Sequence, residues 1–153
     1  MYSLRPMLAS DDDAVIALAR RNHSLSRYSD LSFDADGVRD LVHLMSNSRM
    51  AQGYVLVHDQ FGVVGIIAGM VAKLPWLIEP TASETFFTVH PDHRGYKQAM
   101  MLLRVYVGWA KMSGAKLISV NADNDDASDV RTVVLYNRAG FKSAGRTMSM
   151  KGD

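Results

Sequence analysis

Apolar positions are spaced in two different ways along the chain, and each spacing predicts a different kind of element. Around Val15–Ala19 and over residues 35–46 they recur at intervals of three and four, which indicates helices packed by one face. Residues 96–113 are apolar almost all round, which is typical of a helix buried against a sheet. Runs rich in β-branched and aromatic residues predict strands. The expected strands are 2–6, 53–58, 62–71, 82–90, 116–120 and 141–150, and a further helix is expected over 129–138.

The order of these elements, β-α-α-β-β-β-α-β-α-β, indicates an α+β fold, a mixed α/β sandwich. Residues 1–153 are expected to form a single domain, because no repeat, low-complexity tract or Pro/Ser-rich linker interrupts the pattern. Ser10 precedes three aspartates and is expected to cap the first helix, since a side-chain oxygen there accepts from free N–H groups. The polar segment 21–33 is expected to be an irregular loop.

Charge and composition narrow the range of functions. The 17 Lys and Arg residues nearly balance the 16 Asp and Glu residues, and no run of like charges occurs, so nucleic-acid binding is disfavoured. Cysteine is absent, which excludes disulfides, thiolate metal sites and a cysteine acyl-enzyme. The N-terminus lacks an apolar signal-peptide core, and Lys73 and Pro75 interrupt the apolar stretch 62–78. We therefore expect a cytoplasmic protein with no nucleic-acid or membrane partner.

The sequence HPDHRGYKQAM, residues 90–100, joins an expected strand to the long expected helix. A loop of this kind, containing Arg94 and Gly95, directs free backbone N–H groups and the positive helix end toward one point. That arrangement favours binding of phosphate-type anions. Taken by itself, the segment is equally consistent with an ordinary turn.

Residues 89–99, VHPDHRGYKQA, resemble the acetyl-CoA loop of the GNAT superfamily of N-acetyltransferases. Val89, Pro91, Arg94, Gly95 and Ala99 match that family's pattern. LRPMLASDDDAVIAL, starting at residue 4, resembles the family's first strand and helix, and VLYNRAGF, starting at residue 134, resembles its closing motif. The resemblance implies a GNAT-like fold, with a central, mostly antiparallel sheet flanked by about four helices.

The resemblance also implies acetyl-CoA as co-substrate. Lys97 departs from the family pattern, because it stands where a signature glycine is usual; it would either add a charge beside the diphosphate or obstruct it. The family often has an asparagine that bonds the pantetheine; the strictly aligned position in this chain is Asp129, and Asn124 takes its place if the loop is longer. The residues implied to bind the cofactor are Thr88, Val89, Arg94, Gly95, Tyr96, Lys97, Gln98, Ala99 and Asn124.

By the same resemblance, the expected reaction is direct transfer of an acetyl group to a primary amine, either a small molecule or a protein. A backbone N–H near Val89 would stabilise the oxyanion. Tyr136 would protonate the departing sulfur, or would simply pack in the core with its hydroxyl satisfied. Glu84 would act as the base, or would be a solvated charge at a strand edge.

Other residues carry weaker expectations. His23, Tyr28 and Phe33 lie in the segment that generally covers the acceptor pocket in this family, and they would contact the amine or pack within the loop. His90 and His93 lack evident further ligands, so no metal site is expected. The alternative function is a non-catalytic GNAT-fold module with a degenerate cofactor loop, and a homodimer is left open.

Overall fold

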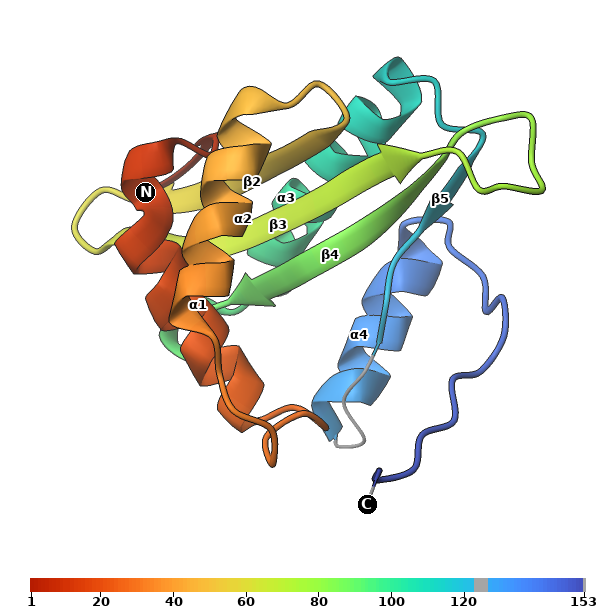
Figure 1. Cartoon of the computed structure of the whole chain (residues 1–153). Coiled ribbons are helices and arrows are strands. Elements are labelled where there is room, and N and C mark those ends of the chain that lie inside the picture. The colour runs from red at the N-terminus through yellow and green to blue at the C-terminus, as the bar shows by residue number, and fades with distance from the viewer. Residues whose placement is uncertain (123–126, 153) are drawn as a thin grey trace.

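The fold is a five-stranded sheet between two layers of helices, in a computed structural model that describes residues 1–122 and 127–152 (Figure 1). The strands lie side by side in chain order. Neighbours among the first four are antiparallel, whereas β5 is parallel to β4. The predicted α+β fold with a mostly antiparallel sheet is confirmed. The strands are β1 (Tyr2–Pro6), β2 (Ala51–His58), β3 (Gly62–Ala72), β4 (Thr81–Val89) and β5 (Leu117–Ser119).

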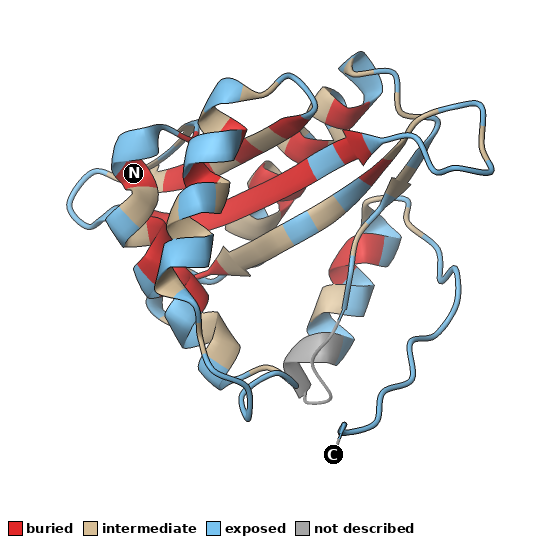
Figure 2. Cartoon of the chain, viewed as in Figure 1, coloured by how far each residue is buried: buried red, intermediate tan, exposed pale blue. Residues whose placement is uncertain are grey.

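Two pairs of helices cover the two faces of the sheet. On one face, α1 (Asp12–Ser24) and α2 (Ala35–Asn47) bury Val15, Val42 and Met45 against Val55 and Ile66. The other face is covered by α3 (Tyr96–Met112) and α4 (Ala127–Arg138). Each buried side chain of this size contributes about 1.5–3 kcal/mol. Figure 2 shows the buried residues concentrated on the central strands and on the helix faces turned toward them.

The α3 layer packs against an almost fully buried surface. Leu102, Leu103 and Tyr106 of α3 are at most 1% exposed and lie against Leu56 and Ile67 of the sheet. This agrees with the nearly continuous apolar pattern of residues 96–113. Among the described residues, no helix is long and apolar enough to cross a membrane.

The start of α1 differs from the expectation. Ser10 does not cap the helix; it lies in a 3-10 turn, Ala9–Asp11, and α1 begins at Asp12. Asp11 instead accepts hydrogen bonds from Arg5 at 2.7 and 2.8 Å and from the Leu8 N–H at 2.8 Å. A bidentate carboxylate at this position ties β1 to the turn before α1, and a hydroxyl could not do this. At its other end, α1 continues to Ser24, into the segment expected to be loop.

The prediction of a closing strand over residues 141–150 is wrong. These residues pair with no strand among the described residues, and most of them are exposed. Met148 and Met150 are 92% and 95% exposed, so neither side chain packs against the sheet, and only Thr147 in the segment is β-branched. The segment runs apart from the sheet in Figure 1, and near its end Lys151 pairs with Asp30 at 2.8 Å.

Replacing Asp11 by Asn is expected to lower the free energy of unfolding by about 2 kcal/mol at neutral pH, because Asp11 is only 6% exposed and bonded to a charged group. Hydrogen bonding from Arg5 lowers the pKa of Asp11 in the folded protein. The difference between wild type and variant is therefore complete above the pKa of an unperturbed aspartate, about 4. It shrinks as pH falls through the lowered pKa, which urea unfolding at several pH values measures.

Asp13→Asn is the control. The Asp13 side chain is 86% exposed and contacts Arg39 at 3.0 Å, so its loss is expected to cost less than about 1 kcal/mol. Equal effects of the two substitutions would contradict the prediction.

Candidate functional site

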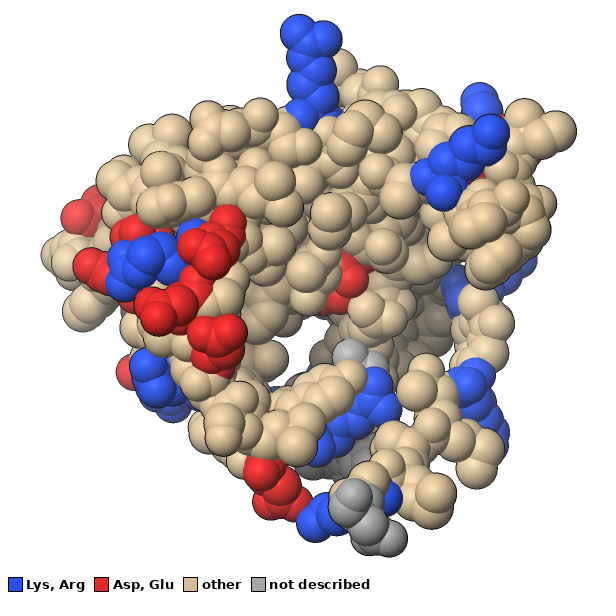
Figure 3. Space-filling view, viewed as in Figure 1, with Lys and Arg blue, Asp and Glu red and all other residues tan. Residues whose placement is uncertain are grey.

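A cleft opens where β4 and β5 separate. Their pairing ends at Ser83 and Ser119, and past that point the described residues provide β4 with no strand neighbour on this side. The cleft has a volume of about 820 Å³ and is bounded by β4, by α1 and α2, and by α4. Figure 3 shows the surface hollowed in this region of the molecule.

A β-bulge in β4 decides which side chains enter each side of the cleft. Glu84 is opposite Gly69 and Phe86 is opposite Ala68, so Thr85 is an extra residue with no partner on β3. A bulge of this kind breaks the alternation of side chains and re-aims them. As a result, Phe86 packs with the core under α1 and α2, whereas Phe87 packs with the core under α3 and α4.

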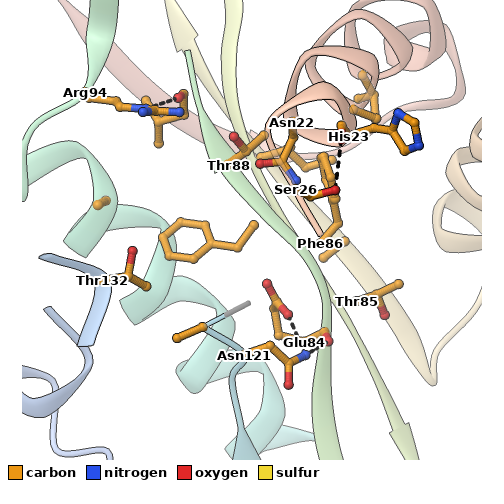
Figure 4. Close-up of a pocket in the computed structure, with 18 of the residues that line it drawn as sticks. Asn22, His23, Ser26, Glu84, Thr85, Phe86, Thr88, Arg94, Asn121 and Thr132 are labelled. Carbon is orange, nitrogen blue, oxygen red and sulfur yellow. Dashed lines mark hydrogen bonds between the residues drawn. The ribbon is translucent and has the colours of Figure 1, made fainter. Parts of the chain in front are cut away.

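Asn121 joins the two residues that the sequence proposed for catalysis. Its side-chain amide donates to a Glu84 carboxylate oxygen at 3.1 Å and to the Glu84 carbonyl at 3.2 Å. Its backbone carbonyl accepts from the Tyr136 hydroxyl at 2.8 Å. In Figure 4, Asn121 and Glu84 point toward each other across the cleft. Sequence analysis missed Asn121; its position directly after an expected strand was the available signal.

Tyr136 is a buried residue with a hydrogen-bonded hydroxyl. It is 7% exposed, and its ring stacks on that of Phe87 with the ring centroids 6.3 Å apart. The ring centroids of Tyr136 and Phe141 are 5.9 Å apart. Tyr136 is among the residues that line the cleft, and its hydroxyl is bonded to the Asn121 carbonyl. Its packing and its satisfied hydroxyl agree with the core alternative, and its role as a proton donor stays a prediction.

The end of β4 presents a backbone N–H to the cleft. The His90 N–H donates to Val64 of β3 at 2.7 Å, so the alternation of an antiparallel strand turns the Val89 N–H toward the opposite, open edge. The Val89 carbonyl on that edge accepts from Arg94 Nε at 2.9 Å. Arg94 thus fixes the loop to the strand and leaves the Val89 N–H as the donor facing the cleft.

The loop after β4 leads directly into the N-terminus of α3. Gly95 is the N-cap residue, and the first helical bond joins the Ala99 N–H to the Gly95 carbonyl at 3.1 Å. The N–H groups of Tyr96, Lys97 and Gln98 therefore have no acceptor within the helix. Free N–H groups at a helix N-terminus favour anions, and anion binding by this loop stays a prediction.

Gly95 is not required by backbone conformation. Its φ of −174° is extended, a conformation that any residue adopts. A Cβ added there would collide with the Gln98 side-chain oxygen, the far end of a flexible side chain. The glycine therefore leaves room for the Gln98 side chain and is not needed for a turn.

The structure brings most of the predicted site residues to the cleft. Lys97 is exposed and lies outside the lining, as does Gln98. Asn124 lies outside the described residues. The predicted residues that line the cleft are His23, Tyr28, Phe33, Glu84, Thr88, Val89, Arg94, Gly95, Tyr96, Ala99 and Tyr136.

The candidate acceptor residues differ in how they lie. The His23 ring packs near Phe33, with centroids 5.4 Å apart, and Figure 4 shows it pointing away from Glu84 and Asn121. Its Nε2 is buried and has no hydrogen-bond partner among the described residues. Tyr28 is 45% exposed and carries the Arg27 guanidinium 4.8 Å from its ring centroid. His23 and Phe33 therefore also pack within the wall, as the loop-packing alternative expected.

The two histidines of the β4–α3 loop belong to an aromatic cluster. His93 accepts or donates a 3.0 Å hydrogen bond with the Tyr2 hydroxyl, and its ring lies within 6 Å of the rings of Tyr2, His58, Phe61 and His90. In the part of the chain that the structure describes, no three His, Asp or Glu side chains are grouped to hold a metal ion.

No family model matches the sequence, and no curated protein matches it. Solved structures match by fold over nearly the whole chain. Glucosamine-6-phosphate N-acetyltransferase from Arabidopsis thaliana gives a TM-score of 0.76 at 14% identity, covering 100% of this chain and 99% of that one. Ribosomal-protein-alanine N-acetyltransferase from Brucella melitensis biovar Abortus 2308 gives 0.74 at 16%, covering 100% of both. An acetyltransferase from Trypanosoma brucei gives 0.72 at 16%, covering 99% of both.

The chain has the GNAT fold. This confirms the resemblance found in the three sequence motifs. At these identities the likeness concerns the fold, and the names of two of these proteins specify a sugar phosphate and a ribosomal protein. Similarity of fold therefore assigns no acceptor to this chain.

Gly95→Ala is expected to change the free energy of unfolding by less than about 0.5 kcal/mol, because φ is permissive and the Gln98 side chain can move. Gly69→Ala is the matched control. A Cβ there would collide with the Tyr106 ring and lie 2.9 Å from the Ser83 carbonyl oxygen, so a loss of about 1–3 kcal/mol is expected. Denaturant unfolding of both variants measures the contrast, and a large loss in Gly95→Ala would show that this glycine serves folding.

Proposed function

We propose that this protein is an acetyl-CoA-dependent N-acetyltransferase that transfers an acetyl group directly to a primary amine. One observation carries the proposal: at the open edge of β4, a free backbone N–H, a carboxylate and a helix N-terminus face the same cleft. This combination supplies the three needs of the reaction, which are an oxyanion donor, a base and a site for the diphosphate.

The residues of the cofactor loop fit a diphosphate. The N–H groups of Tyr96, Lys97 and Gln98 have no helical acceptor, and Gly95 beside them carries no side chain. Lys97 lies outside the cleft lining, which favours a role as a nearby positive charge over obstruction. The uncovered edge of β4 from Glu84 to Val89 is the place for the pantetheine arm.

The chemical step is an exchange of two bonds at the acetyl carbon. The amine nitrogen bonds to this carbon as the carbon–sulfur bond breaks, and Glu84 accepts the proton that the amine releases, directly or through a water. The Val89 N–H stabilises the negative charge that develops on the acetyl oxygen. Asn121 holds the Glu84 carboxylate in the cleft and is a positioning residue.

Tyr136 is the candidate proton donor to the departing thiolate. Its hydroxyl proton is directed at the Asn121 carbonyl, 2.8 Å away, so donation requires this hydrogen bond to be exchanged for one to sulfur. Because Tyr136 lines the cleft beside Asn121, the exchange needs rotation of the hydroxyl rather than movement of the ring.

Titration calorimetry with acetyl-CoA tests the proposal. The wild type is expected to bind acetyl-CoA, and coenzyme A is expected to compete. Gly95→Val is expected to weaken binding at least tenfold, because a branched side chain fills the approach to the N–H groups. Lys97→Gly is expected to weaken it by no more than about 1 kcal/mol, with a smaller salt dependence. Absence of binding by the wild type at millimolar ligand would overturn the proposal and favour the non-catalytic module.

Glu84→Gln is expected to lower kcat/KM by roughly a hundredfold below the pKa of the amine, where the acceptor most needs a base. The loss should diminish as pH rises, because the amine is then neutral without help. The pH profile of acetyl transfer measures this. Glu79 is the chain's other glutamate, exposed and outside the cleft, so Glu79→Gln serves as the control. A loss that is uniform across pH would indicate damage to positioning instead.

A further inference from the structure

The cleft continues past Glu84 into an apolar arm on the other face of the sheet. This arm lies between β4 and the pair α1 and α2. Val15 and Ala19 of α1, Val38, Leu41 and Val42 of α2, and Phe86 of β4 contribute its walls. All six are apolar, whereas the polar lining residues Asn22, His23, Ser26 and Tyr28 come from the end of α1 and the segment after it.

The open edge of β4 separates the part of the cleft that contains Glu84 from the apolar arm. Glu84 lies with Asn121 on one side of this edge, and Phe86, two residues later, lies on the other side because of the bulge at Thr85. Figure 4 shows Phe86 on the side of Asn22 and Ser26, and Asn121 on the other side of the β4 ribbon. Glu84 and the apolar side chains of the arm therefore line one cleft on two sides of the same strand.

The inner end of the arm is closed by the core. Val42, Met45, Ile66 and Ala68 line it and are each at most 2% exposed. A closed apolar end accepts a compact group and excludes a long chain, because side chains of the core occupy the space beyond it.

The charges that line the cleft argue against acceptors with a second charge. Among the described residues of the lining, Glu84 provides the carboxylate and Arg94 and Arg131 provide the cations. Arg94 belongs to the loop before α3, and Arg131 belongs to α4; both lie outside the α1, α2 and β4 walls of the arm. A second ammonium or a phosphate in the arm would lose water without gaining an opposite charge there.

We infer that the acceptor is a primary amine whose nitrogen is carried on a compact apolar body, aromatic or branched aliphatic, with no second charge near it. This inference rests on the proposed function and names the substrate class of the same site. Free amines of this kind and the N-terminal residue of a peptide with an apolar side chain share this chemistry. The amine nitrogen lies at Glu84 and the apolar body fills the arm.

The inference predicts an order of acceptors for the full-length protein with acetyl-CoA. Phenethylamine and isopentylamine are expected to have kcat/KM at least tenfold above those of spermidine and glucosamine 6-phosphate. Comparison of kcat/KM for phenylalaninamide with kcat/KM for a tripeptide amide beginning with phenylalanine distinguishes free amines from peptide N-termini as acceptors. A preference for spermidine or glucosamine 6-phosphate would overturn the inference.

Val38→Phe tests the arm itself. The added ring fills the space, so kcat/KM for phenethylamine is expected to fall at least tenfold while the acetyl-CoA dissociation constant stays within twofold. Leu44 is on the same helix, 51% exposed and outside the lining, so Leu44→Phe should change neither value. Equal activity of the two variants toward phenethylamine would overturn the inference.

Val38→Ala provides a second test that does not depend on packing a larger side chain. It widens the arm, and kcat/KM for 2-(1-naphthyl)ethylamine is expected to rise relative to that for phenethylamine. An unchanged ratio would contradict the placement of the apolar body.

Calorimetry with acetyl-CoA distinguishes failure of the substrate class from failure of the proposed function. If the protein binds acetyl-CoA but prefers charged acceptors, the substrate class alone is refuted. If it does not bind acetyl-CoA, the proposed function is refuted.

Discussion

The separation of β4 from β5 after Ser83 is the constraint on which the site depends. A strand inside a domain normally satisfies its N–H and C=O groups on both edges, and leaving such groups unpaired is costly. On the open edge of β4, two carbonyl groups accept hydrogen bonds from side chains instead of from a neighbouring strand. Asn121 donates to the Glu84 carbonyl and Arg94 donates to the Val89 carbonyl. The Val89 N–H remains directed at the cleft. The edge is thus stabilised where the fold requires it and open where a ligand would bind.

The bulge at Thr85 gives this edge two different sides. Without the extra residue, Glu84 and Phe86 would lie on the same face of β4, as residues two apart do in a regular strand. With it, Glu84 meets Asn121 on one side and Phe86 joins the apolar wall on the other. One added residue therefore places a carboxylate next to an apolar arm, and this juxtaposition is the basis for the proposed substrate class.

Similarity of fold does not choose among acceptors. The matched structures carry names that specify a sugar phosphate in one case and a ribosomal protein in another, at nearly equal TM-scores. The shared part is the fold, and function depends on the side chains placed on it. In the proposal made here, the side chains that choose the acceptor come from α1, α2 and the bulged strand, and they are mainly apolar.

Local sequence determined most of the elements and the joint between β4 and α3. The spacing of apolar residues predicted α2, β3 and α3, because each of these elements buries one face or nearly all of its surface. Arg94 and Gly95 marked the joint between strand and helix, because the first N–H groups of any helix lack an acceptor within it. The same local patterns misassigned Ser10 and residues 141–150. Asp11 and not Ser10 is the N-cap residue of α1, its side chain is held by Arg5 of β1, and a strand requires a neighbouring edge; the spacing of apolar residues reveals none of these.

Only the tertiary structure decided how the site is assembled. Asn121 lies 37 residues from Glu84 and 15 from Tyr136, and its role follows from hydrogen bonds that no spacing encodes. The bulge at Thr85 is likewise set by how β4 pairs with β3, so the sequence named Glu84 but left its direction open. The apolar arm needs three elements, α1, α2 and β4, brought together around one edge. Local periodicity indicates which residues are buried, whereas the shape of the space between elements depends on their packing.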